Sequence, residues 1–181
     1  MKNFYKLKIK NFLKSNTDKF FLENSLSWQT YSVNYQEWLE PETIYTLNSL
    51  SVFPDKAYIF KAPPMSILPI HIDGNQNSSR VWAINIVWGS NNHNMHWYKI
   101  IRKSNIVLHT QASTPYLMFN KDDVEEVENV SNLVGPTLVR INVPHSVSNY
   151  DNKIRYCFSL RCLSKNDTWE KIIDQFKFFI D

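Results

Sequence analysis

Short runs of β-forming residues, separated by polar turns, fill the middle of the chain between residues 57 and 163. The clearest run covers residues 81–88, where large apolar side chains stand at every second position. Because successive side chains of a strand point to opposite faces, one face of this strand should hold Trp82, Ile84, Ile86 and Trp88. Further runs lie at residues 57–62, 66–72, 95–101, 106–110, 116–119, 138–143 and 154–163. Short strands at this spacing indicate a mainly β sandwich or barrel.

The pattern changes on both sides of these runs. Residues 1–56 are predicted to be mostly helical, with one helix at residues 12–22 and another beginning at Pro41, a residue suited to a first helical turn. Residues 167–180 have apolar side chains at helical spacing, and Asp167 or Thr168 can cap that helix. The sequence therefore predicts one domain over residues 1–181, with a β core at 57–163 and helices at both ends.

An acidic segment at residues 122–128 interrupts the strand pattern. Charged runs of this kind most often lie on solvated surfaces. We expect it to form a surface loop or a helical turn.

Composition narrows the class of protein. The chain has 181 residues, of which 43% are hydrophobic and 20% charged, as expected for a folded domain that is not embedded in a membrane. The net charge is +3, and nucleic-acid binders usually concentrate more positive charge than this. Lysines interrupt every apolar run in the first twenty residues, so no secretory signal is expected there. Cys157 and Cys162 should lie on opposite faces of one strand as free thiols, which favours a cytoplasmic location.

The candidate chemistry begins at His71 and Asp73. They are two positions apart, so on a strand their side chains share a face and can take adjacent positions on one metal ion. The alternative is an ordinary histidine followed by an aspartate that forms a turn before Gly74.

A third ligand is offered by His145, which follows Pro144 at the end of a β-type run. Two imidazoles and one carboxylate on one side of an octahedral metal leave the other side open, which is the ligand set of non-haem Fe(II) oxygenases. The alternative is a strand-end histidine that bonds to the backbone.

Arg155 begins the last predicted strand, ten residues after His145. It should share a face with Cys157, Ser159 and Arg161. A buried guanidinium needs an anionic partner, and its planar fork suits a carboxylate. The alternatives are an exposed Arg155 on an edge strand and a structural ion pair for Arg161.

These pieces together resemble the Fe(II)/2-oxoglutarate-dependent dioxygenase superfamily. The segments HIDG, RVWAINIVWG, HWY, VPHSVSN and RYCFSLR are most similar to small aspartyl/asparaginyl-hydroxylase-like and prolyl-hydroxylase-like members. The resemblance covers residues 57–163. It implies a double-stranded β-helix, the cupin-like jelly roll, in which His71, Asp73 and His145 hold Fe(II).

The resemblance also implies a function. Arg155 would bind the distal carboxylate of the cosubstrate 2-oxoglutarate, and Arg80 corresponds to a second cosubstrate-binding arginine in the first of the two subgroups. That subgroup often lacks the carboxylate ligand that Asp73 provides here. The implied activity is hydroxylation of an amino acid, a peptide side chain or a small metabolite by dioxygen, with release of succinate and CO2.

Two other functions stay open. Arg155 and Arg161, six residues apart, resemble the arginine pair of AlkB-type nucleic-acid demethylases. A non-catalytic, cupin-like binding protein would have the same jelly roll.

His93 and His96 form another candidate metal pair only if they lie on a helix, whereas the preceding turn favours a strand. An inward Asn85 is a further candidate contact of the cosubstrate.

Overall fold

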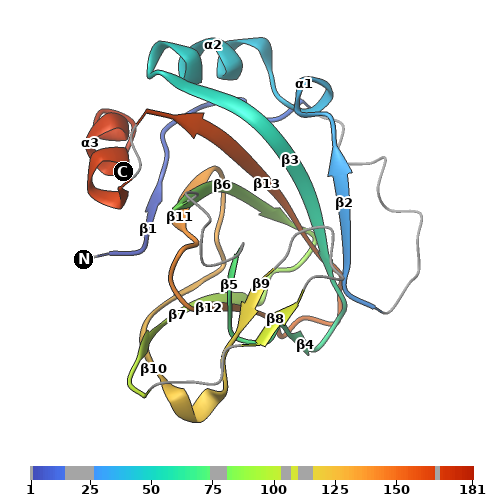
Figure 1. Ribbon diagram of the computed structural model, residues 1–181. Coiled ribbons are helices and arrows are strands. Elements are labelled where there is room, and N and C mark those ends of the chain that lie inside the picture. Colours follow the sequence, from blue (N-terminus) through green and yellow to red (C-terminus); the bar gives the residue numbers. More distant parts are fainter. Residues whose placement is uncertain (1, 15–26, 74–80, 103–106, 110–115, 166–167) are drawn as a thin grey trace.

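Two antiparallel β-sheets lie one above the other in the computed structural model of the protein (Figure 1), which describes residues 2–14, 27–73, 81–102, 107–109, 116–165 and 168–181. Side chains from both sheets meet between them. Trp97 of the lower sheet packs with Ala83 and Val139 of the upper one, and the Trp97 indole donates a 2.9 Å hydrogen bond to the Arg140 carbonyl. Apolar side chains therefore fill one part of the space between the sheets, and a cavity occupies another part.

The upper sheet has six strands. In spatial order they are β1 (Phe4–Lys6), β11 (Thr137–Arg140), β6 (Trp82–Trp88), β13 (Arg155–Ser164), β3 (Val52–Ala62) and β2 (Gln29–Val33). β13 is central, since it pairs with β6 on one side and along the whole length of β3 on the other.

The lower sheet has seven strands. Its main path runs β10 (Val124–Ser131), β7 (His93–Ile100), β12 (His145–Asn149), β5 (His71–Asp73), β9 (Tyr116–Met118) and β8 (Val107–His109), while β4 (Ser66–Ile67) also pairs with β12. A short 3-10 helix, η2 (Lys121–Asp123), precedes β10.

The connections make this a double-stranded β-helix. From β3 the chain passes to β4 and β5 in the other sheet, returns for β6, crosses for β7 and β10, and then alternates again through β11, β12 and β13. This is the jelly-roll arrangement. The predicted fold class, mainly β with helices before and after the core, is confirmed.

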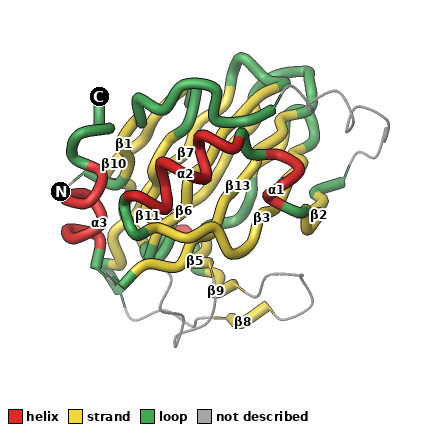
Figure 2. Tube along the Cα trace, turned by 90° about the horizontal axis from the view of Figure 1, so that it is seen from above, coloured by secondary structure: helices red, strands yellow, loops and turns green. Residues whose placement is uncertain are grey.

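The larger hydrophobic core lies on the outer face of the upper sheet. Three helices cover that face: α1 (Tyr35–Trp38), α2 (Pro41–Ser49) and α3 (Trp169–Phe176), as the view from above shows for α1 and α2 (Figure 2). Trp38 stacks on Phe158 of β13 with ring centroids 5.8 Å apart. The predicted outward face of β6, from Trp82 to Trp88, joins this core. Cys162 also lies here and Cys157 on the opposite face, and no disulfide joins them, as predicted.

The helix boundaries follow local chemistry. Pro41 stands at the first position of α2, where its missing N–H costs nothing. Thr168 caps α3 by accepting a hydrogen bond from the Lys171 amide. Of the two predicted caps, Thr168 is therefore confirmed, and Asp167 lies outside the described residues. None of the described helices has the length and apolar character needed to cross a membrane.

Several predicted elements are wrong. The described part of residues 1–56 contains β1 and β2 as well as helices, so it is not mostly helical. Leu13 forms a β-bridge with Leu39, and most of the predicted helix at 12–22 falls outside the described residues. The acidic segment is mainly strand: after η2, β10 pairs with β7 and leaves Glu125 and Glu126 exposed, whereas Glu128 accepts hydrogen bonds from Asn3. The predicted strand at 66–72 is two strands, since Pro69 interrupts it.

Replacing Phe158 by alanine should lower the free energy of unfolding by about 3–5 kcal/mol, because this fully buried ring lies at the centre of the outer core. Urea denaturation measures the change. The matched control is Phe178→Ala, whose ring is 84% exposed and should matter by less than about 0.5 kcal/mol. Equal effects of the two substitutions would contradict this placement of the core.

Candidate metal centre and its cavity

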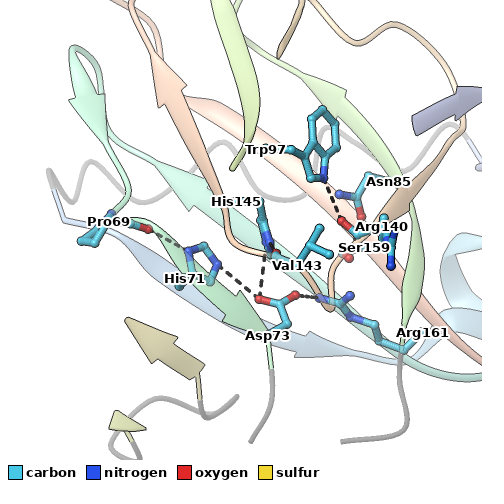
Figure 3. A network of polar contacts seen from close by, with 10 residues as sticks. All are labelled: Pro69, His71, Asp73, Asn85, Trp97, Arg140, Val143, His145, Ser159 and Arg161. Carbon is cyan, nitrogen blue, oxygen red and sulfur yellow. Dashed lines mark hydrogen bonds and ion pairs between the residues drawn. The ribbon is translucent and has the colours of Figure 1, made fainter. Parts of the chain in front are cut away.

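Three predicted ligands meet inside the jelly roll. His71 and Asp73 point to one side of β5, and His145, the first residue of β12, stands directly opposite His71 in the antiparallel pair. One ligand atom from each side chain lies within 4.8 Å of the other two (Figure 3). Both imidazoles are buried and Asp73 is partly exposed. The geometry is that of three ligands around one ion.

Backbone carbonyls fix the orientation of both imidazoles. His71 Nδ1 lies 2.8 Å from the Pro69 oxygen, and His145 Nδ1 lies 2.9 Å from the Val143 oxygen. A carbonyl only accepts, so each Nδ1 carries a proton, and in the neutral form of each ring Nε2 is the atom that keeps its lone pair. Hydrogen bonds of this kind set the tautomer of metal-binding histidines.

The two Nε2 atoms then face the same carboxylate oxygen. His71 Nε2 lies 3.2 Å from Asp73 Oδ1, and His145 Nε2 lies 3.8 Å from it. Burial raises the pKa of Asp73, but the Arg161 guanidinium and both histidines outweigh it and hold that pKa well below its ordinary value. Burial, and then His71, lower the pKa of His145 to about 4. When both imidazoles are neutral, three electron-rich atoms converge, and a cation between them would balance their repulsion.

Asp73 has a second partner. Arg161 Nη2 donates to Asp73 Oδ2 at 2.6 Å, which leaves Oδ1 for the histidine side (Figure 3). The short charged hydrogen bond orients the carboxylate as a one-oxygen ligand. From the sequence, Arg161 could be either a structural ion pair or a site residue; it pairs with Asp73 and also lines the cavity. Its position on the same face of β13 as Arg155 was the signal that pointed to the site.

The three ligands open on a cavity of about 240 Å³. The inward face of β13 forms one wall with Arg155, Cys157, Ser159 and Arg161, as the alternation predicts. Asn85 accepts a 2.7 Å hydrogen bond from Ser159 on the same wall, so its predicted inward position is confirmed. The rest of the lining is mostly apolar, from Leu68, Met95, Ile141, Val147 and aromatic side chains nearer β2 and β9.

Arg155 differs from Arg161 in having no acidic partner. Its residue is only 3% exposed, and among the described residues its Nε has no hydrogen-bond partner and no carboxylate forms an ion pair with it. Burial lowers the pKa of Arg155, with the Cys157 thiol as its polar neighbour. A buried, unpaired guanidinium is costly. Its place in the cavity wall makes it a ready site for an anion.

Local packing holds Arg155 in place. The Asn149 amide, fully buried, donates 2.8 Å hydrogen bonds to the carbonyls of Pro63 and Lys153, which ties the end of β12 to the end of β3 just before β13 begins. Gly89 has a φ of +89°, and a side chain there would collide with the Ile154 carbonyl. Glycine is therefore required where the turn after β6 meets β13. Asn149 therefore has a structural role beside the cavity.

The other candidate residues from the sequence are His93, His96 and Arg80. His93 and His96 lie three apart on β7 and so on opposite faces: His93 is buried inward, whereas His96 bonds to Glu126 and Ser148. They do not share a metal site, as the strand prediction requires. Arg80 lies outside the described residues.

Comparison with known proteins gives only distant similarity. No protein-family model matches the chain, and no curated protein matches it. Among solved structures, an oxalate oxidase bound to glycolate shares 14% identity at a TM-score of 0.39, over 79% of this chain and 54% of that one. An oxidoreductase of the 2OG-Fe(II) oxygenase family from Burkholderia pseudomallei shares 13% identity at a TM-score of 0.39, over 71% and 53%.

The oxalate decarboxylase of Bacillus subtilis, with Mn(II) centres, shares 11% identity at a TM-score of 0.36, over 80% of this chain and 27% of that one. The chain thus spans about half the length of these structures, or less. Similarity this low carries no argument about the reaction. The candidate site rests on the side chains of this chain alone.

Replacing His145 by alanine should weaken binding of a divalent metal by at least about 100-fold, since it removes one of three ligands and leaves a gap in the site. Calorimetric titration of metal-free protein with Fe(II) under anaerobic conditions measures the affinity. His96→Ala is the control, because His96 faces away from the cavity. Undiminished Fe(II) binding by the His145 variant would rule out this centre.

Stability of the metal-free protein should fall as the pH drops from about 6.5 to about 4. Burial lowers the pKa of both His145 and His93 from 6.5 to about 4, with Arg155 as the second cause at His93. In this pH range the unfolded chain binds more protons than the folded protein does, so acid favours unfolding. Chemical denaturation at pH 7 and pH 5 measures the loss. His93→Asn should make it smaller, and an unchanged loss would contradict the assignment to His93.

Proposed function

We propose that the protein is an Fe(II)- and 2-oxoglutarate-dependent oxygenase that hydroxylates an amino acid, a peptide side chain or a small metabolite. One observation carries the proposal: a buried set of two histidines and one aspartate shares its cavity with Arg155, a buried guanidinium that lacks an acidic partner among the described residues. The first feature fits a metal ion and the second fits an anion. A cosubstrate that is bound by both satisfies both.

The donor set favours Fe(II). Two neutral imidazoles and one carboxylate on one side of an ion leave its other coordination positions open, as in non-haem iron oxygenases. Bound there, Fe(II) and 2-oxoglutarate would supply the oxidation of a substrate C–H bond by dioxygen, with succinate and CO2 as the other products. The residues that would hold the ion are His71, Asp73 and His145.

Charge favours a dicarboxylate as the anion. Arg161 and Asp73 neutralise one another through their 2.6 Å contact, which leaves Arg155 and the divalent ion as uncompensated positive charges. A dianion balances part of that charge with one carboxylate at each end. Arg155 and Arg161 are six residues apart on β13, about 20 Å between Cα atoms, so their guanidiniums serve different ends of the cavity.

The chain contributes position and exclusion of water. Arg161 keeps Asp73 aimed with one oxygen toward the histidines, and the carbonyls of Pro69 and Val143 engage both Nδ1 atoms, so that Nε2 of each ring would face the ion. Met95, Ile141 and Val147 line the cavity with apolar surface. A dry wall strengthens the charge interactions of the bound anion and shields reactive species from solvent.

The test is an anaerobic titration of metal-free protein with Fe(II) and 2-oxoglutarate. A visible charge-transfer band should form only when both are present. Arg155→Ala should weaken the affinity for 2-oxoglutarate by about 10- to 100-fold, because it removes a charge-assisted contact to a buried carboxylate.

Arg102→Ala is the matched control, since Arg102 is exposed and outside the cavity. A folded protein that binds Fe(II) but gives no band, or an Arg155 variant that binds 2-oxoglutarate normally, would refute the proposal. Metal binding without 2-oxoglutarate would instead identify a cupin-like binding protein.

A further inference from the structure

One part of the cavity wall has no charge and no role in holding the metal or the anion. Apart from Gln29, whose Oε1 accepts a hydrogen bond from the Tyr31 hydroxyl, it consists of Trp28, Thr30, Phe60, Leu68, Pro69 and Tyr116. Three of these six residues are aromatic, and they come from both sheets. This group, the neutral wall, lies where β2, an edge strand of the upper sheet, and β9 of the lower sheet border the cavity.

Strand register places one side of the neutral wall. Phe60 of β3 stands opposite Cys157 of β13, and Thr30 of β2 stands opposite Phe60. Trp28 is two positions before Thr30 and lines the same cavity. This row crosses the upper sheet from β13 to its edge, at the level of Cys157, two residues from Arg155. It therefore borders the space beside the predicted cosubstrate.

The other side of the neutral wall stands next to the metal ligands. Tyr116 of β9 pairs with Asp73 of β5, and its ring meets the His71 ring edge-on with centroids 5.6 Å apart. Leu68 and Pro69 come directly before β5 on the same side. A group held between this side and Phe60 would lie beside the metal centre.

Charge decides what kind of group fits. Asp73 is the only carboxylate among the described lining residues, and Arg161 already engages it. A cationic group would meet no free acid there and would face two guanidiniums and a divalent ion. An anionic group would find Arg161 already paired and Arg155 taken, a step that rests on the proposed binding of 2-oxoglutarate.

We infer that the neutral wall binds an uncharged aromatic group of the substrate, of the size of an amino-acid side chain, between Phe60 and Trp28 on one side and Tyr116 on the other. Aromatic rings gain affinity from edge-to-face and offset contacts beyond the area that they bury. The geometry favours aromatic over cationic substrates, although aromatic walls elsewhere can attract cations.

The test uses three probes on the anaerobic Fe(II)–2-oxoglutarate complex: N-acetyl-L-phenylalaninamide, N-acetyl-L-lysinamide, and the α-amide of N-acetyl-L-aspartic acid, whose side-chain carboxylate is free. The paramagnetic ion broadens NMR signals of any probe that binds near it, so titration gives affinities without turnover. The phenylalanine probe should bind at least about 10-fold more tightly than either charged probe. Phe60→Leu should weaken it about 3- to 10-fold, whereas Phe53→Leu, on the same strand outside the cavity, should not.

Calorimetry of 2-oxoglutarate binding on the same samples separates the two proposals. If 2-oxoglutarate does not bind, the proposed function fails and the inference falls with it. If it binds to every variant with normal affinity, three results overturn the inference alone: no broadening of the phenylalanine probe, equal or tighter binding of the lysine probe, or equal affinities in the Phe60 and Phe53 variants.

Discussion

Three buried lone pairs meet at one point, and much of the structure serves to hold them there. His71 and His145 face each other across the pairing of β5 with β12, and both turn Nε2 toward Asp73. Without a positive charge between them these atoms repel, in surroundings where burial disfavours extra protons. The jelly roll brings together ligands that are more than seventy residues apart in the sequence because it lays β12 beside β5.

The outer face of the upper sheet contributes most of the hydrophobic core, and its inner face carries the residues of the candidate site. On the outer face, β6 and β13 turn Trp82, Ile84, Phe158 and Leu160 into the large core beneath the helices. On the inner face the same strands present Asn85 and the two arginines to the cavity. Since the outer core stabilises the sheet, the inner face tolerates buried charges that would otherwise destabilise a small domain.

The sequence predicts what depends on neighbours along the chain. Alternation in β6 and β13, the shared face of His71 and Asp73, and the cap at Thr168 are local patterns, and each agrees with the structure. What was missed depends on distant partners. β10 looks like a solvated acidic loop until β7 pairs with it, and the contact between Arg161 and Asp73 joins residues 88 positions apart. No spacing rule reveals which of two arginines on one strand face meets that aspartate.

The contrast between those two arginines is what argues for a ligand from outside the chain. Both are buried on the same face of β13, so both face the same desolvation cost. Arg161 offsets that cost with a carboxylate of the protein, whereas Arg155 has none among the described residues. A purely structural arginine in this position would gain by pairing as Arg161 does. Tight packing by Asn149 and Gly89 nevertheless fixes the chain around Arg155. A guanidinium held ready in a cavity wall is what binding a carboxylate requires, because its ordering is complete before the ligand arrives.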